Sequence, residues 1–70
     1  MTDSYLTLNG KRHPYPGAAL MLLLAEFDVA PDARGVAVAV NGEVVPRREW
    51  PDIQLAPGDE VDIVGAVQGG

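Results

Sequence analysis

The sequence predicts an α+β fold in which a mixed sheet of four to five strands carries one helix on one face. Two Asn-Gly pairs, Asn9-Gly10 and Asn41-Gly42, each follow a short segment of alternating side chains, which is the strongest short-range signal of a β-hairpin. Only residues 17–28 have the spacing of an amphipathic helix. Hairpins on either side of one helix are typical of a sheet covered by a single helical layer.

The first hairpin is predicted for residues 4–15. Leu6 and Leu8 fall on one side of the first strand, and polar or aromatic residues fall on the other. Residues 11–15 form the returning strand and include Pro14. Because proline cannot donate a ladder hydrogen bond, we expect this strand at an edge of the sheet.

The helix is predicted over residues 17–28. Its core-facing stripe has the i, i+3, i+4, i+7 spacing and consists of Leu20, Leu23, Leu24 and Phe27. Met21 and Leu22 lie off this stripe, so the helix is more apolar than a surface helix requires. Two interpretations remain open, a wide buried face or an exposed contact patch.

A second hairpin is predicted for residues 36–45, with valines on one face of its first strand and alanines on the other. Residues 46–51 are bracketed by prolines and should not form a long regular element. Residues 56–59 have Pro and Gly in the order of a type II turn. A final strand follows this turn.

The last strand alternates between core and solvent. With hairpins on both sides of the helix, the first and last strands can pair in parallel at the centre of the sheet, which is the β-grasp topology of ubiquitin-like domains. The residues then expected to face the helix are Leu6, Leu8, Val36, Val38, Val40, Val61 and Ile63. We expect one domain over residues 1–67 and a flexible tail over residues 68–70.

The opposite face of the sheet is a candidate docking surface. Its small or uncharged residues are Tyr5, Thr7, Ala37, Ala39, Val64 and Ala66. Apolar patches rimmed by charge tend to mark interfaces. The alternative, scattered small residues on a solvated sheet, remains open.

Size and charge exclude several classes of protein. The chain has 70 residues, no cysteine and a net charge of −5. The charge disfavours nucleic acid as a partner, because phosphate binding needs clustered Lys and Arg. No apolar run approaches the length that crosses a bilayer, and the acidic start does not resemble a secretory signal. We expect a cytoplasmic protein with no membrane partner.

The side chains offer no catalytic or metal site. His13 is the single histidine and, without cysteine, cannot make a closed zinc site. No phosphate-binding Gly-rich loop is present, so no cofactor is expected to be bound. The chain is therefore not expected to be an enzyme.

The tail offers a different chemistry. Gln68, Gly69 and Gly70 can reach roughly 10 Å in extended form and could enter a narrow channel of a partner. The Gly70 carboxylate is ionised at neutral pH and accepts nucleophiles poorly, so a partner that uses ATP would have to activate it as an acyl adenylate.

Two segments and the tail carry a family resemblance. They are Val38-Ala39-Val40-Asn41-Gly42-Glu43-Val44-Val45-Pro46-Arg47-Arg48-Glu49-Trp50 and Leu55-Ala56-Pro57-Gly58-Asp59-Glu60-Val61-Asp62-Ile63-Val64, followed by Gly69-Gly70. The chain closely resembles the ThiS sulfur carriers of thiamin biosynthesis. The resemblance implies a β-grasp protein whose Gly70 carboxylate is adenylated by a ThiF-type adenylyltransferase. It also implies conversion to a thiocarboxylate, with sulfur from a cysteine desulfurase or another donor, and delivery of that sulfur to thiazole synthase, ThiG.

Other functions stay open on the sequence alone. A related carrier could serve molybdopterin synthesis or tRNA thiolation, and a ubiquitin-like modifier could be joined to lysines through Gly70. A plain interaction domain with an incidental Gly-Gly end is the third alternative. Gln68 stands where the family often has a glycine or another small residue.

Overall fold

The fold is seen in a computed structural model that describes residues 4–30 and 33–65. Its elements, in chain order, are β1 (Tyr5–Leu8), β2 (Lys11–Pro14), α1 (Leu20–Glu26), β3 (Val36–Val40), β4 (Glu43–Val45), the 3₁₀ helix η1 (Arg47–Asp52) and β5 (Glu60–Gly65). The five strands form one sheet in the order β2-β1-β5-β3-β4. β5 pairs in parallel with β1 and antiparallel with β3.

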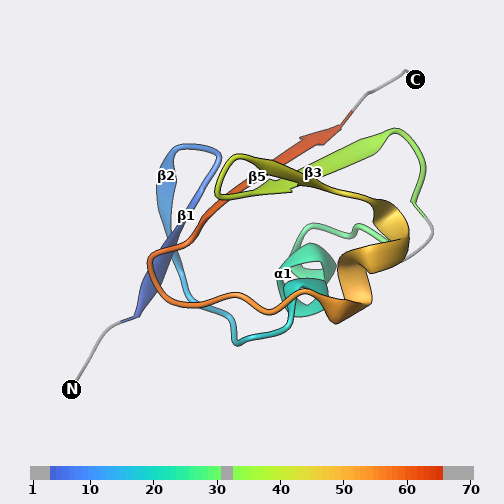
Figure 1. Ribbon diagram of the computed structural model, residues 1–70. Coiled ribbons are helices and arrows are strands. Elements are labelled where there is room, and N and C mark those ends of the chain that lie inside the picture. Colours follow the sequence, from blue (N-terminus) through green and yellow to red (C-terminus); the bar gives the residue numbers. More distant parts are fainter. Residues whose placement is uncertain (1–3, 31–32, 66–70) are drawn as a thin grey trace.

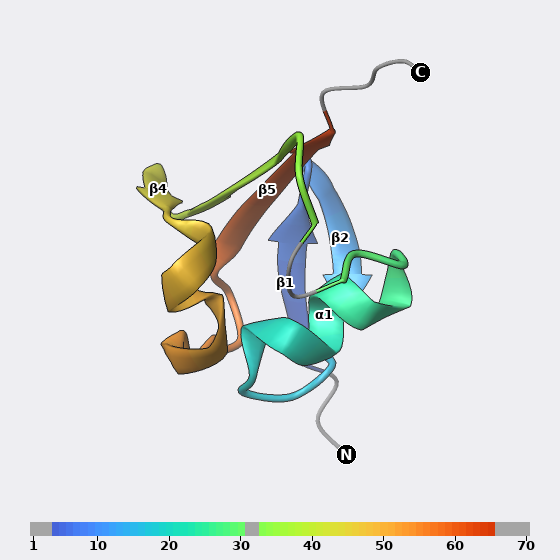
Figure 2. The same cartoon turned by 90° about the vertical axis from the view of Figure 1, so that its right-hand side faces the viewer.

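The molecule has two layers. The sheet forms one layer, and α1 and η1 lie side by side against one of its faces (Figure 1, Figure 2). This arrangement confirms the predicted α+β class and the parallel pairing of the first and last strands. None of the helices in the described part of the chain is long and apolar enough to span a bilayer.

Both hairpins turn at the predicted Asn-Gly pairs. Asn9 and Gly10 have φ of 51° and 83°, and Asn41 and Gly42 have φ of 52° and 85°. Positive φ at both central residues defines the type I′ turn, whose twist matches that of the two strands it joins. The type II turn before β5 is also confirmed, because Gly58 has φ of 93° and the Asp59 N–H donates to the Ala56 carbonyl over 3.1 Å.

The helix is shorter than predicted and begins at Leu20 rather than Gly17. The preceding residues are held by the segment that follows η1: the Leu55 N–H donates to the Ala18 carbonyl at 2.6 Å, and the Leu20 N–H donates to the Ile53 carbonyl at 3.2 Å. Gly17 has φ of 131°, and a Cβ there would lie 2.9 Å from the Leu22 side chain. Long-range pairing therefore replaces the first predicted turn of the helix.

The helix ends in a Schellman motif. Asp28 is left-handed with φ of 58°, and the Val29 N–H donates to the Leu24 carbonyl at 3.0 Å. Phe27 is the C-cap, with φ of −110° and a 40% exposed side chain. The prediction that Phe27 belongs to the core stripe is wrong, because the helix has already ended where its ring would have turned inward.

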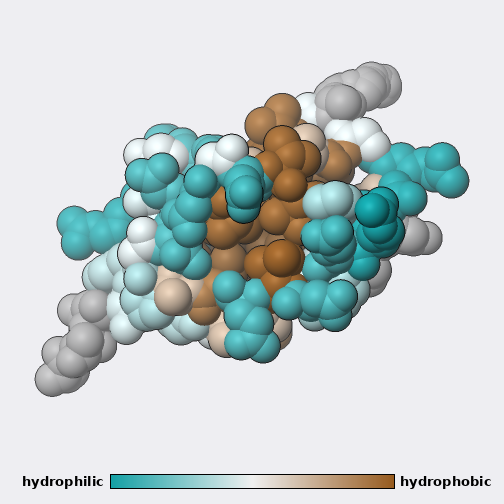
Figure 3. Space-filling model, in the orientation of Figure 1, coloured by the Kyte–Doolittle hydropathy of each residue, from teal (hydrophilic) through white to brown (hydrophobic). Residues whose placement is uncertain are grey.

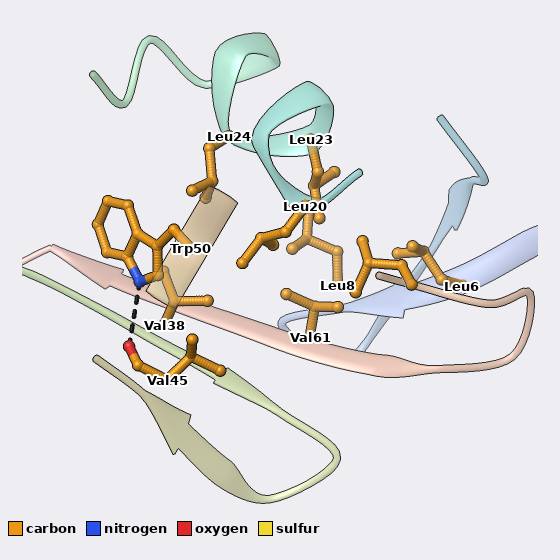
Figure 4. Close-up of a cluster of buried hydrophobic side chains, with 10 residues drawn as sticks. Leu6, Leu8, Leu20, Leu23, Leu24, Val38, Val45, Trp50 and Val61 are labelled. Carbon is orange, nitrogen blue, oxygen red and sulfur yellow. Dashed lines mark hydrogen bonds between the residues drawn. The ribbon is translucent and has the colours of Figure 1, made fainter. Parts of the chain in front are cut away.

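The core lies between the sheet and the two helices (Figure 4). Its buried residues are Leu6, Leu8, Leu20, Leu23, Leu24, Val38, Val45, Trp50, Leu55 and Val61. The other predicted inward residues, Val36, Val40 and Ile63, are partly buried and pack against this cluster. Met21 does the same, whereas Leu22 is 51% exposed, so the helix has both a widened buried face and one exposed leucine.

Trp50 fills the core beneath β3 and β4. The segment between the prolines forms a short 3₁₀ helix, and its only buried residue is Trp50. The indole N–H donates to the Val45 carbonyl at 3.0 Å (Figure 4). A single aromatic residue thus anchors η1 under the sheet edge.

Candidate functional site

The candidate site is the open face of the sheet together with the tail that follows β5. Five of the six residues expected on this face are described, and their positions in the strands point them away from α1: Tyr5, Thr7, Ala37, Ala39 and Val64. Ala66 lies outside the described residues. So do the three residues of the expected tail, Gln68, Gly69 and Gly70.

Two carboxylates divide the open face. Glu60 and Asp62 alternate with the inward-facing Val61, and β5 lies between β1 and β3. The acidic pair therefore separates Tyr5 and Thr7 from the alanines of β3. Alternation along the last strand predicts that both carboxylates face outward, but the strand order is needed to place them between the two halves of the face.

The apolar half of this face contains one residue beyond those predicted from the sequence, Val44. Val44 pairs with Ala39, and Ala37 pairs with Val64, so all four share one side of the sheet. Val44 is 75% exposed and Val64 is 60% exposed. We call these four residues the alanine–valine patch. The type I′ turn at Asn41-Gly42 fixes the register between β3 and β4, so this turn could have predicted that Val44 lies beside Ala39 on the open face.

The other half of the open face is polar. Arg12 pairs with Thr7, and its guanidinium lies over the Tyr5 ring, 4.9 Å from the ring centre. A cation over an aromatic face is attracted by the ring quadrupole. The Tyr5 ring is therefore partly covered, and the apolar surface is concentrated in the alanine–valine patch.

Both hairpin turns hold β5, the strand that leads to the tail. The Ile63 N–H donates to Asn9 Oδ1 at 2.8 Å, and Asn9 Nδ2 donates to the Ile63 carbonyl at 3.2 Å. At the other end of the strand, the Glu60 N–H donates to Asn41 Oδ1 at 2.9 Å, and Asn41 Nδ2 donates to Asp59 Oδ1 at 3.2 Å. The asparagine side chains thus extend the pairing of β5 beyond the regular ladder. The geometry gives the tail a fixed base.

His13 pairs with the inward-facing Leu6, so its side chain lies on the helix-covered face of the sheet and not on the open face. Its Nε2 lies 3.0 Å from Glu26 Oε1, and its ring meets Phe27 edge-on with 5.7 Å between ring centres. These contacts tie the edge strand β2 to the end of α1. Within residues 4–30 and 33–65, no group of three or more His, Asp or Glu side chains could hold a metal ion.

Comparisons with known proteins agree with this geometry. A model of the ThiS family matches residues 6–70. The sulfur carrier protein ThiS of Thermus thermophilus is 41% identical over 63 residues, which are 90% of this chain and 95% of the relative. The crystal structure of the thiamine biosynthesis protein ThiS from Geobacter metallireducens superposes with a TM-score of 0.73 at 32% identity, covering 94% of this chain and 99% of that one. A solution structure of a thiamine biosynthesis protein from Geobacter metallireducens gives a TM-score of 0.72 at 33% identity, covering 94% of this chain and 87% of that one.

Proposed function

Because the chain belongs to the ThiS family and is a sulfur carrier protein of thiamin biosynthesis, we propose that its sulfur is carried on the Gly70 carboxylate. The observation that carries this proposal is the reach of the family match, which extends through residue 70. A sulfur carrier is not itself catalytic, so the chemistry belongs to partner enzymes.

The proposed loading has two steps. A carboxylate oxygen of Gly70 attacks the α-phosphorus of ATP in a ThiF-type adenylyltransferase, and pyrophosphate leaves. A sulfur nucleophile then attacks the acyl carbon. It is either sulfide or the outer sulfur of a protein persulfide formed by a cysteine desulfurase, and in the second case a thiol reductant cleaves the resulting acyl disulfide to the thiocarboxylate. AMP leaves, and one oxygen of the carboxylate has been exchanged for sulfur. Since the first step consumes ATP, we propose that the protein acts in the cytoplasm.

The proposed unloading takes place on a second enzyme. The thiocarboxylate donates its sulfur to the thiazole ring in a ThiG-type synthase. The five residues after β5 span at most about 18 Å when extended, which is long enough to enter an active site while the domain stays outside. Without Cβ atoms, Gly69 and Gly70 fit a channel that would exclude larger residues.

We assign the alanine–valine patch to docking on the activating enzyme. Its two exposed valines lie on strands of the sheet, and Val64 directly precedes Gly65, the last residue of β5. Apolar contact there would position the tail as it enters the partner. The polar half of the open face, with Arg12 over Tyr5, is less suited to such contact.

Intact mass spectrometry tests the loading. The protein is incubated with the adenylyltransferase, ATP and a sulfur source, and the expected product has one oxygen exchanged for sulfur at the C-terminus. A variant lacking Gly70 is the matched control and should stay unmodified. Loading of that variant, or transfer of sulfur to a different residue of the full chain, would overturn the proposal.

A further inference from the structure

A groove between β4 and η1 meets the open face at one residue, Val44 of the alanine–valine patch, and otherwise lies outside that face. Its volume is about 490 Å³, and its apolar lining consists of the exposed Val44 and of three more buried residues, Val40, Val45 and Ile53, which we call the floor. Figure 3 presents this side of the molecule, where a hydrophobic surface is framed by hydrophilic side chains. Figure 2 shows η1 directly below β4, and the lining residues of the groove come from both elements.

The rim of the groove is acidic. Glu43, Glu49 and Asp52 line it, and no basic residue does. In the described part of the chain, the recorded ion pair joins His13 and Glu26, so the three rim carboxylates have no ion-pair partner there. An apolar floor within an anionic rim is complementary to an aliphatic side chain flanked by cations.

We propose that this groove binds a basic amphipathic segment of a partner protein, in which an aliphatic side chain enters between lysines or arginines. A second copy of this chain is a poor occupant, because each copy carries a net charge of −5 and would bring more carboxylates to the rim. Nucleic acid is repelled by the same charge. A basic protein surface is attracted by both the rim and the net charge.

The position of the groove allows a partner to make a second contact with the carrier, in addition to the contact with the tail. Val40 pairs with Val61, which lies four residues before Gly65, or roughly 13 Å along β5. A segment seated in the groove therefore leaves the end of β5 free. This inference rests on the proposed function for the identity of the partner, an enzyme that loads or unloads the tail. Two linked contacts on one partner raise affinity without strengthening either contact.

Methyl NMR titration with a defined peptide tests the groove. The probe is a synthetic seven-residue peptide with two leucines, each flanked by lysines, added to isotopically labelled full-length protein. We expect saturable shifts of the Val40, Val45 and Ile53 methyl signals that weaken as salt is raised. Replacing the leucines by serine or the lysines by glutamate should abolish the shifts.

A matched pair of variants separates the rim from general charge attraction. Glu49→Gln with Asp52→Asn should weaken binding by about fivefold, because two exposed ion pairs are lost. Glu60→Gln with Asp62→Asn removes the same charge from the open face and should weaken binding much less, because it reduces only the screened long-range attraction of the net charge. Equal weakening in both variants, or shifts centred on Val64 instead of the floor, would overturn the proposal.

Two further outcomes would overturn the groove as a binding site for a basic segment. The first is the absence of methyl shifts at saturating peptide. The second is the appearance of the same shifts when the protein concentration alone is raised, which would indicate self-association. The titration does not involve Gly70. Failure of the groove would therefore leave sulfur loading intact, and failure of loading would not affect the peptide titration.

Discussion

At the scale of single residues, Trp50 is a core residue that its neighbours in the sequence do not predict. It lies in a polar segment between two prolines, yet its side chain is 1% exposed and its indole N–H satisfies the Val45 carbonyl. The proline pattern predicted that residues 46–51 would not form a long regular element. It could not predict that one residue of this segment reaches the core, because the contact depends on where β4 lies.

Trp50→Phe should lower the free energy of unfolding by about 2–3 kcal/mol. The substitution leaves the Val45 carbonyl without its donor, which costs about 1–3 kcal/mol, and the smaller ring leaves part of the site empty. Urea denaturation measures the difference. Arg48→Ala, in the same 3₁₀ helix but exposed, should change stability by less than about 0.5 kcal/mol. Equal losses in the two variants would contradict this role of Trp50.

At the scale of elements, local signals predicted the turns but not the ends of the helix. Each Asn-Gly pair specifies a type I′ turn through its own backbone preference, so both hairpins could be predicted from neighbouring residues. The start of α1 depends instead on residues 18–20, which pair with residues 53–55. The periodicity of residues 17–28 could not predict where the helix begins, because residues 53–55 are distant in the sequence.

The asparagine side chains at these turns are predicted to protect β5. Asn9→Gly keeps the positive φ and removes both side-chain hydrogen bonds to Ile63, which should cost about 1 kcal/mol. Hydrogen exchange of the Ile63 amide should accelerate in this variant. Asn41→Gly is the matched control and should accelerate exchange at Glu60 instead. If Asn9→Gly leaves Ile63 as protected as in the wild-type protein, the side chain does not hold the strand.

At the scale of the whole molecule, the sequence predicted the layers and the inward-facing residues better than the surface. Alternation assigns each residue to one face of its strand, which placed Val38 and Val61 correctly in the core. Surface patches also depend on which strands are neighbours. The position of β5 between β1 and β3 puts Glu60 and Asp62 across the expected patch, and this order becomes visible only in the assembled sheet.

Charge in the alanine–valine patch should weaken docking on the activating enzyme. We expect Val64→Glu to raise the dissociation constant by about tenfold or more, because burying an unpaired carboxylate at an interface is costly. Ala25→Glu places the same charge on the exposed side of α1 and should have little effect. Isothermal titration calorimetry compares the two variants. Similar affinities would remove the patch from the docking surface.

The place of β5 between two neighbouring strands also has a mechanical consequence. A pull on the residues after Gly65 loads the hydrogen bonds on both sides of the strand in shear, so many of them must break together. A pull on the edge strand β4, which has one neighbour, can peel its bonds apart one after another. Single-molecule stretching between β1 and β5 should therefore require a larger force than stretching through a handle at Val44. Under the proposed function, a partner enzyme can therefore pull on the tail without unfolding the domain.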